Sequence, residues 1–132
     1  MARGEYEPEF GRLHDAVLLE PEKIRSIVRE NPETLEATNR TGENVLRWCA
    51  LENRFDDVKL LRSLGSSIQE ASLTEAIEMG NTDMLLLLLE LGGQILPSRA
   101  ESSIRLGKEF GGLSSRQAHI CQTHLRSFGI NV

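Results

Sequence analysis

The side chains best able to hold a metal ion gather in the last part of the sequence, at His119, Cys121 and His124. Imidazole nitrogens and thiolates are the ligands that zinc prefers, and a closed structural site needs four of them. On a helix, His119 and Cys121 lie about 200° apart, so one ion would not reach both. The sequence offers no Cys-x-x-Cys pair and no evident fourth ligand. We therefore predict that the chain holds no metal, with the histidines on the surface and the cysteine buried.

Other catalytic constellations are missing from the sequence. It has no glycine-rich phosphate-binding motif, and no nucleophile stands in a recognisable arrangement with a base and an orienting acid. The remaining histidine, His14, is expected to hydrogen-bond near a helix start. We predict that the chain is not an enzyme and uses no cofactor and no small-molecule substrate. An enzyme or metal protein of another type is an alternative that rests only on His119, Cys121 and His124.

Composition and charge indicate an ordinary globular chain. The net charge is -5, and nucleic-acid binding is not expected because phosphate contacts require a basic face. Cys49 and Cys121 are isolated within expected helices, which favours a reducing compartment. Residues 1–7 are charged and lack the apolar core of a secretory signal. The longest apolar run, 84–89, is much shorter than the roughly 20 residues of a membrane span. These features predict a cytoplasmic protein that does not bind a membrane.

A repeat organises the elements that must position any site. An aliphatic residue follows each of three leucines after 15 residues, in the pairs Leu13 and Val28, Leu46 and Leu61, and Leu73 and Leu88. The first two leucines are 33 residues apart, a spacing typical of stacked helix pairs. A small residue stands three positions after each leucine, at Ala16, Cys49 and Ala76. We expect these small residues to occupy equivalent positions where helices approach closely.

Each repeat is predicted to contain a second, more apolar helix, at 22–30, 56–64 and 83–91. Gly65 and Gly92 follow where a left-handed residue would end a helix. Three capping boxes are expected, at Ser72–Glu75, Ser98–Glu101 and Ser114–Gln117, because each serine is followed three residues later by Glu or Gln. A fourth, longer helix pair is predicted at the C-terminal end, divided near Gly111 and Gly112, with Gly129 following its last helix.

The segments 39–46 and 57–65 resemble an ankyrin repeat, with a turn, the start of a first helix, and a second helix that ends in Leu-Gly. The resemblance implies an all-α, ankyrin-like solenoid of about four stacked antiparallel helix pairs. It implies a single domain over 1–132, with repeats at about 10–38, 39–68, 69–95 and 96–132. The interval from Leu46 to Leu73 is 27 residues, so only Thr38–Glu43 has the length of a full hairpin finger. An all-helical domain of another family is the alternative.

Charge is segregated along the repeats. Residues 66–95 contain five acidic and no basic residues, a charge of -5, whereas residues 99–132 contain five basic and two acidic residues, a charge of +3. Partner-facing positions implied by the resemblance are Arg40, Thr41, Glu43, Leu51, Glu52, Glu75, Glu78 and Met79. Glu52, Glu75 and Glu78 are expected to form an acidic inner face, with a merely solvated face as the alternative. Trp48 is a further candidate partner-binding residue, and the sequence is compatible with its lying in the core or at an interface.

These observations predict a stoichiometric protein-binding module whose partner has a basic surface. An inhibitor is the leading hypothesis, of the kind in which a bacterial immunity protein neutralises a cognate toxin or nuclease. The alternative is a scaffold or adaptor that recognises a helix or peptide of a regulatory partner. The apolar run Leu85–Leu89 is expected to be buried on more than one side between repeats rather than to form a partner helix.

Overall fold

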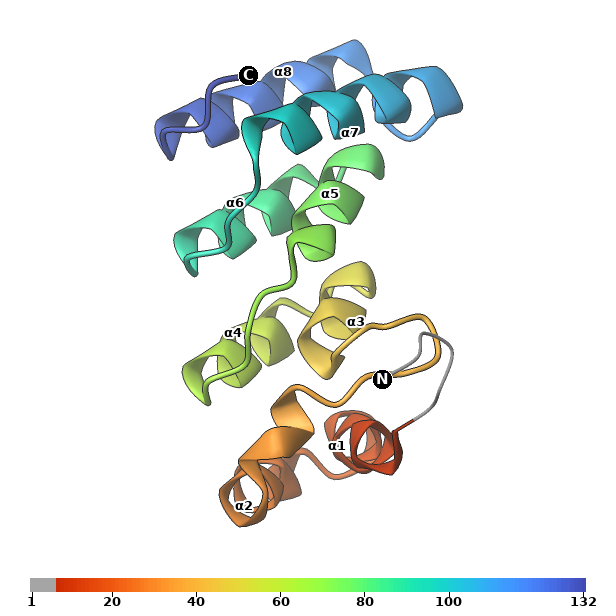
Figure 1. Cartoon of the computed structure of the whole chain (residues 1–132), viewed down its shortest axis with the longest axis vertical. Helices are drawn as coiled ribbons and strands as arrows, with labels where there is room; N and C mark the ends of the chain where they lie inside the picture. The colour runs from red at the N-terminus through yellow and green to blue at the C-terminus, as the bar shows by residue number, and fades with distance from the viewer. Residues whose placement is uncertain (1–6) are drawn as a thin grey trace. The chain divides into compact units, whose positions relative to one another are not determined.

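The computed structural model describes residues 7–132, and these residues form helices without any strand (Figure 1). The predicted all-α class is therefore confirmed. The α-helices are α1 (Pro8–Leu19), α2 (Ile24–Glu30), α3 (Val45–Leu51), α4 (Phe55–Ser63), α5 (Glu70–Glu78), α6 (Thr82–Glu90), α7 (Pro97–Phe110) and α8 (Ser115–Ser127). Two 3₁₀ helices, η1 (Pro21–Lys23) and η2 (Pro32–Leu35), flank α2.

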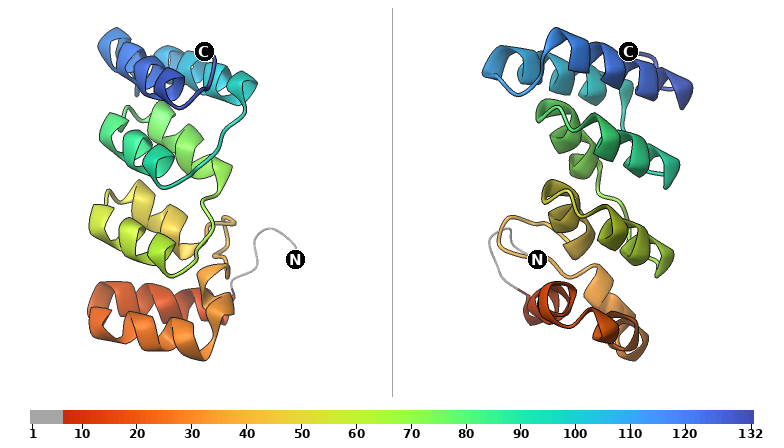
Figure 2. Two further views of the ribbon diagram at one scale, coloured as in Figure 1. Left: turned by 90° about the vertical axis from the view of Figure 1, so that its left-hand side faces the viewer. Right: turned by 180° about the vertical axis from the view of Figure 1, so that it is seen from behind.

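Contacts divide the chain into two compact units, unit 1 up to Ser67 and unit 2 from Ile68 to Val132. In unit 1, η2 packs on α1 and α2, α3 packs on α4, and α1 also touches α3. In unit 2, α5 packs on α7 and α6 on α8, while α5 contacts α6 and α7 contacts α8. The two helices of each hairpin, α3 with α4, α5 with α6 and α7 with α8, run in opposite directions (Figure 2). Unit 2 therefore consists of two stacked antiparallel pairs, and the single-domain organisation over 1–132 stays a prediction.

The second helices end in the same way. A glycine with positive φ follows α4, α6 and α8, at Gly65, Gly92 and Gly129, as predicted. The next backbone N–H then reaches back to a buried leucine carbonyl, as in a Schellman motif. The donor–acceptor pairs are Ser66 and Leu61 at 3.0 Å, Gly93 and Leu88 at 2.8 Å, and Ile130 and Leu125 at 3.0 Å. Leu61, Leu88 and Leu125 therefore occupy equivalent positions, and all three are buried.

The first helices α3 and α5 share a second local geometry. The N–H of Arg54 bonds the Cys49 carbonyl at 2.9 Å, and the N–H of Asn81 bonds the Ala76 carbonyl at 2.8 Å. Cys49 and Ala76 are buried, as is Ala16. The leucines that define the repeat, Leu13, Leu46 and Leu73, have no exposed surface. The predicted burial of the three leucines is thus confirmed, and an equivalent position is shown for Cys49 and Ala76.

Glutamate side chains hold the segments that connect successive helix pairs. In each case a carboxylate oxygen accepts from a backbone N–H that no helix uses, as in a charged N-terminal cap. The donor–acceptor pairs are Thr38 and Glu7, Ser67 and Glu36 at 2.9 Å, and Leu96 and Glu70 at 3.0 Å. The donors Thr38, Ser67 and Leu96 are 29 residues apart in each step. This repeated contact was not predicted from the sequence.

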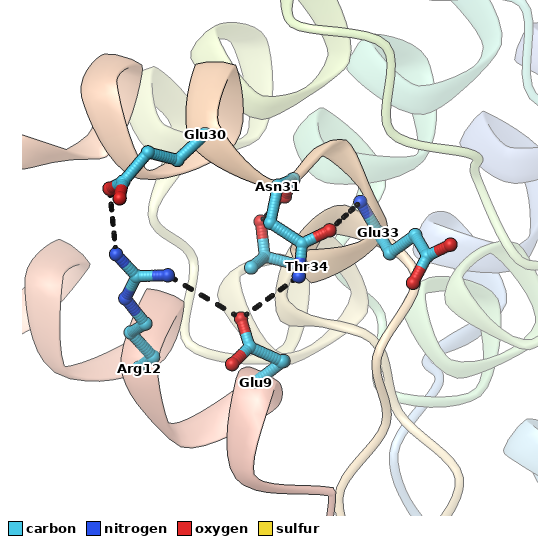
Figure 3. A network of polar contacts seen from close by, with 6 residues as sticks. All are labelled: Glu9, Arg12, Glu30, Asn31, Glu33 and Thr34. Atoms are coloured by element: carbon cyan, nitrogen blue, oxygen red, sulfur yellow. Dashed lines mark hydrogen bonds and ion pairs between the residues drawn. The ribbon is translucent and has the colours of Figure 1, made fainter.

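A polar network joins α1 to the α2–η2 connection in unit 1 (Figure 3). The Arg12 guanidinium pairs with Glu30 at 2.8 Å and lies 3.7 Å from Glu9. The Asn31 amide donates to the Glu9 carboxylate at 3.4 Å, and its oxygen accepts from the Glu33 N–H at 3.2 Å. These side chains are largely exposed, so the network orients the segments more than it stabilises them.

Two of the three predicted capping boxes are wrong. The helix α5 begins at Glu70 with Gln69 as N-cap, so Ser72 lies inside it, and α7 begins at Pro97, so Ser98 is its second residue. Neither helix has a side-chain cap hydrogen bond; Glu70 places a carboxylate at the positive end of α5, and Pro97 suits the first turn of α7. The third box is confirmed, because Ser114 and Gln117 bond each other's backbone N–H at 3.1 and 2.9 Å.

We expect Ser114→Ala to lower the free energy of unfolding by roughly 0.5–2 kcal/mol, because it removes the cap of α8. Ser72→Ala should cost almost nothing or stabilise, because the Ser72 hydroxyl is buried without a hydrogen-bond partner among the described residues. Urea denaturation of both variants tests this contrast. An equal loss in the two variants would contradict the corrected helix starts.

Candidate protein-binding surface

The turn at Thr38–Glu43 is present and is built around Asn39. Its side-chain oxygen accepts from the N–H groups of Thr41 and Glu43, both at 3.0 Å, and its amide donates to the Glu43 carboxylate at 2.7 Å. Gly42 adopts a φ of 81°, which a side chain would disfavour. The turn therefore presents Arg40 and Thr41 as exposed residues, while Glu43 is half-buried and braces the turn.

The end of α3 carries three further candidates, and their exposure differs. Glu52 is exposed just after the helix, whereas Leu51 is half-buried. Trp48 is also half-buried and packs edge-on against His14, with ring centroids 4.2 Å apart. Trp48 thus has both a core contact and accessible surface. The expectation for His14 was wrong, because α1 begins at Pro8 and places His14 in mid-helix, where its ring also stacks on Phe10 at 5.3 Å.

The last turn of α5 brings together Glu75, Glu78 and Met79 in unit 2. The carboxylates are three residues apart and therefore lie on one face of the helix. Met79 is 52% exposed, whereas both glutamates are half-buried rather than exposed. Glu75 and Glu78 are thus grouped within unit 2, whereas Glu52 belongs to unit 1.

A groove of about 370 Å³ runs between α5 and α7 beside this acidic turn. Its lining residues are Thr74, Glu78, Arg99, Ser102, Ser103 and Leu106. Sequence reasoning missed the α7 contribution. A signal was available in the small residues Ala100, Ser103 and Gly107, which recur on one face of α7 and are buried. A larger hollow of about 640 Å³, lined partly by Leu96 and Phe128, contains none of the predicted site residues.

Two glycines allow the end of α5 to lie against α7 and its following loop. A Cβ atom at Gly107 would lie 3.1 Å from the Glu78 Cα atom, and one at Gly112 would lie 2.2 Å from the Glu78 carbonyl oxygen. The second separation is too short for any side chain. These contacts fix the position of the Glu78 backbone beside the groove.

Burial raises the pKa of the Glu78 carboxyl above its ordinary value of 4.5, and the negative charge of Glu75 raises it further. Arg99, which also lines the groove, pairs with Glu70 at 3.0 Å. Among residues 7–132, no Lys, Arg or His nitrogen lies within ion-pair distance of Glu78. The groove therefore holds a carboxylate whose charge is not compensated by a close cation.

We expect Glu78→Gln to stabilise the protein at about pH 7 but not at about pH 4. Because the pKa of Glu78 is raised, the folded protein holds this proton more tightly than the unfolded chain does. This contribution to the free energy of unfolding is complete below the ordinary pKa of 4.5, and it is lost as the pH rises through the raised pKa. Glutamine keeps the shape and removes the charge. Denaturation at both pH values measures the difference, with Glu90→Gln as a control for removing one negative charge at an exposed site. If the difference in free energy of unfolding between wild type and Glu78→Gln were the same at both pH values, the expectation would be contradicted.

The three residues considered for metal binding remain dispersed on α8. His119 is exposed and Cys121 is fully buried, so the prediction that they face different sides is confirmed. Burial raises the pKa of the Cys121 thiol to about 11, which disfavours the thiolate that a metal needs. No group of three His, Cys, Asp or Glu side chains in residues 7–132 is arranged as a metal site.

No family model, curated protein or solved structure matches the chain. Within the described residues, no helix combines the length and apolar character that a membrane crossing requires. In the apolar run of α6, Leu85, Leu87, Leu88 and Leu89 are buried in unit 2, and Leu86 is half-buried. The predicted burial is confirmed for four of the five leucines of Leu85–Leu89.

Proposed function

We propose that the chain is an ankyrin-like solenoid that binds another protein stoichiometrically through its acidic first-helix residues. The observation that best supports this proposal is the end of α5, where two carboxylates, an exposed methionine and a groove lie together. The uncompensated charge of Glu78 favours a partner with a basic surface. The braced turn at 38–43 and the recurrent helix ends support the ankyrin-like interpretation.

Our leading hypothesis is that this binding inhibits the partner. An acidic protein that covers the basic surface of a toxin or nuclease would block the surface that such an enzyme uses for phosphate groups. The net charge of -5 and the acidic segment 66–95 support this role. A bacterial immunity protein would work in this way in the cytoplasm, and neither a cofactor nor catalysis by this chain is required.

Co-expression with the product of the neighbouring gene tests the proposal. We expect a one-to-one complex by size exclusion, and loss of the partner's activity in proportion to the amount of complex. A one-to-one complex in which the partner keeps its activity would favour the scaffold or adaptor hypothesis over inhibition. If the two proteins elute separately at concentrations well above micromolar, the proposal for that gene pair is wrong.

A further inference from the structure

The groove beside Glu78 has the chemistry of a site for one cationic side chain. Its carboxylate is half-buried and lies next to the hydroxyl-bearing residues Thr74, Ser102 and Ser103. A hydroxyl oxygen can accept from an ammonium or guanidinium group, and the Thr74 hydroxyl already donates to the Ala71 carbonyl at 3.1 Å. Because the Thr74 proton is used in that bond, its oxygen has lone pairs left to accept from an incoming cation.

Charge within the groove selects against an anion. Arg99 is the only cation that lines it, and its guanidinium is held by Glu70 at the other end of the same helix as Glu78. Glu75 adds a second negative charge beside Glu78. The groove volume of about 370 Å³ leaves room for one long side chain.

Apolar surface borders this charged site. Leu106 lines the groove and is 39% exposed, and Met79 directly follows Glu78 and is 52% exposed. A long side chain with an aliphatic stem and a charged head matches both features, because the stem contacts apolar atoms while the head reaches the carboxylate.

We propose that the α5–α7 groove binds a lysine or arginine side chain of the protein partner, with an apolar neighbour of that residue resting on Met79 and Leu106; this rests on the proposed function. The cation supplies the counter-charge that Glu78 lacks. Because the bound cation favours the ionised carboxylate, binding releases the proton that Glu78 retains at lower pH.

A peptide titration followed by ¹⁵N–¹H NMR tests this proposal on the full chain. The probe is the capped peptide Gly-Leu-Lys-Leu-Gly, and its matched control carries norleucine in place of lysine. With the lysine peptide we expect saturable shifts at residues 74–79 and 99–106, and a dissociation constant about 5–10-fold higher in Glu78→Gln. Binding should also weaken from about pH 7 to about pH 5 in the wild type, but not in Glu78→Gln.

The matched variant Glu90→Gln removes an exposed charge from the end of α6 and should leave peptide binding unchanged. Equal shifts with the norleucine peptide, shifts confined to other residues, or no saturable shifts would overturn the groove assignment. A one-to-one partner complex would then still support the proposed function. Conversely, lysine-specific shifts in the groove without any partner complex would support the groove and contradict the proposed function.

Discussion

Leu61→Ala and Leu88→Ala are each expected to lower the free energy of unfolding by roughly 2–5 kcal/mol. Leu61 is 1% exposed in α4 and Leu88 is 0% exposed in α6, so each substitution removes buried methyl groups and leaves a cavity. Their carbonyls would still accept the Schellman hydrogen bonds, because the backbone is unchanged. The loss therefore measures packing at the repeated leucine position rather than helix termination.

Two exposed leucines provide matched controls for these substitutions. Leu19 is 76% exposed in unit 1 and Leu96 is 60% exposed in unit 2, and their alanine variants should change stability by less than about 0.5 kcal/mol. Chemical denaturation gives all four values. Because α6 packs on α8, hydrogen exchange in Leu88→Ala should also accelerate in α8. Losses below about 0.5 kcal/mol for Leu61 and Leu88 would contradict their core role.

Much of the local fold could be predicted because it depends on short-range patterns. The second helices predicted at 56–64 and 83–91 are observed at Phe55–Ser63 and Thr82–Glu90, each shifted by one residue. The predicted helix at 22–30 is observed as η1 followed by α2. Hydrophobic spacing places the core, and glycine at a left-handed position ends the helix, so neighbouring residues contain the necessary information.

Helix starts were less predictable where the first side chain of a helix bonds a distant segment instead of capping its own helix. Ser72–Glu75 satisfies the pattern of a capping box, but Glu70 begins α5 and bonds the Leu96 N–H, 26 residues away. This correction also changes the interpretation of Glu75, which no longer has a capping role with Ser72. The groove was missed for the same physical reason, because its walls come from α5 and α7 and depend on the close approach at Gly107.

Glu78→Lys is expected to slow association with the basic partner about ten-fold at low salt, because it reverses the charge at the centre of the groove. The matched variant Glu90→Lys changes the net charge equally but lies outside the groove, at the end of α6. It should slow association no more than about two-fold, since only long-range steering is reduced. Glu52→Lys, in unit 1, tests separately whether the end of α3 contributes.

Stopped-flow or surface-based kinetics with the identified partner can separate steering from direct contact. Steering alone affects the association rate and fades as salt rises, because added ions screen exposed charges over roughly 10 Å at 0.1 M. A contact in the groove also raises the dissociation rate, and truncating a buried charge pair costs roughly 2–5 kcal/mol. Glu78→Lys should therefore remain impaired at high salt, while Glu90→Lys should become indistinguishable from wild type. Circular dichroism must show equal helix content in all variants. If Glu78→Lys and Glu90→Lys behave alike at every salt concentration, the α5–α7 groove is solvated surface, and the turn at 38–43 becomes the better candidate for the partner contact.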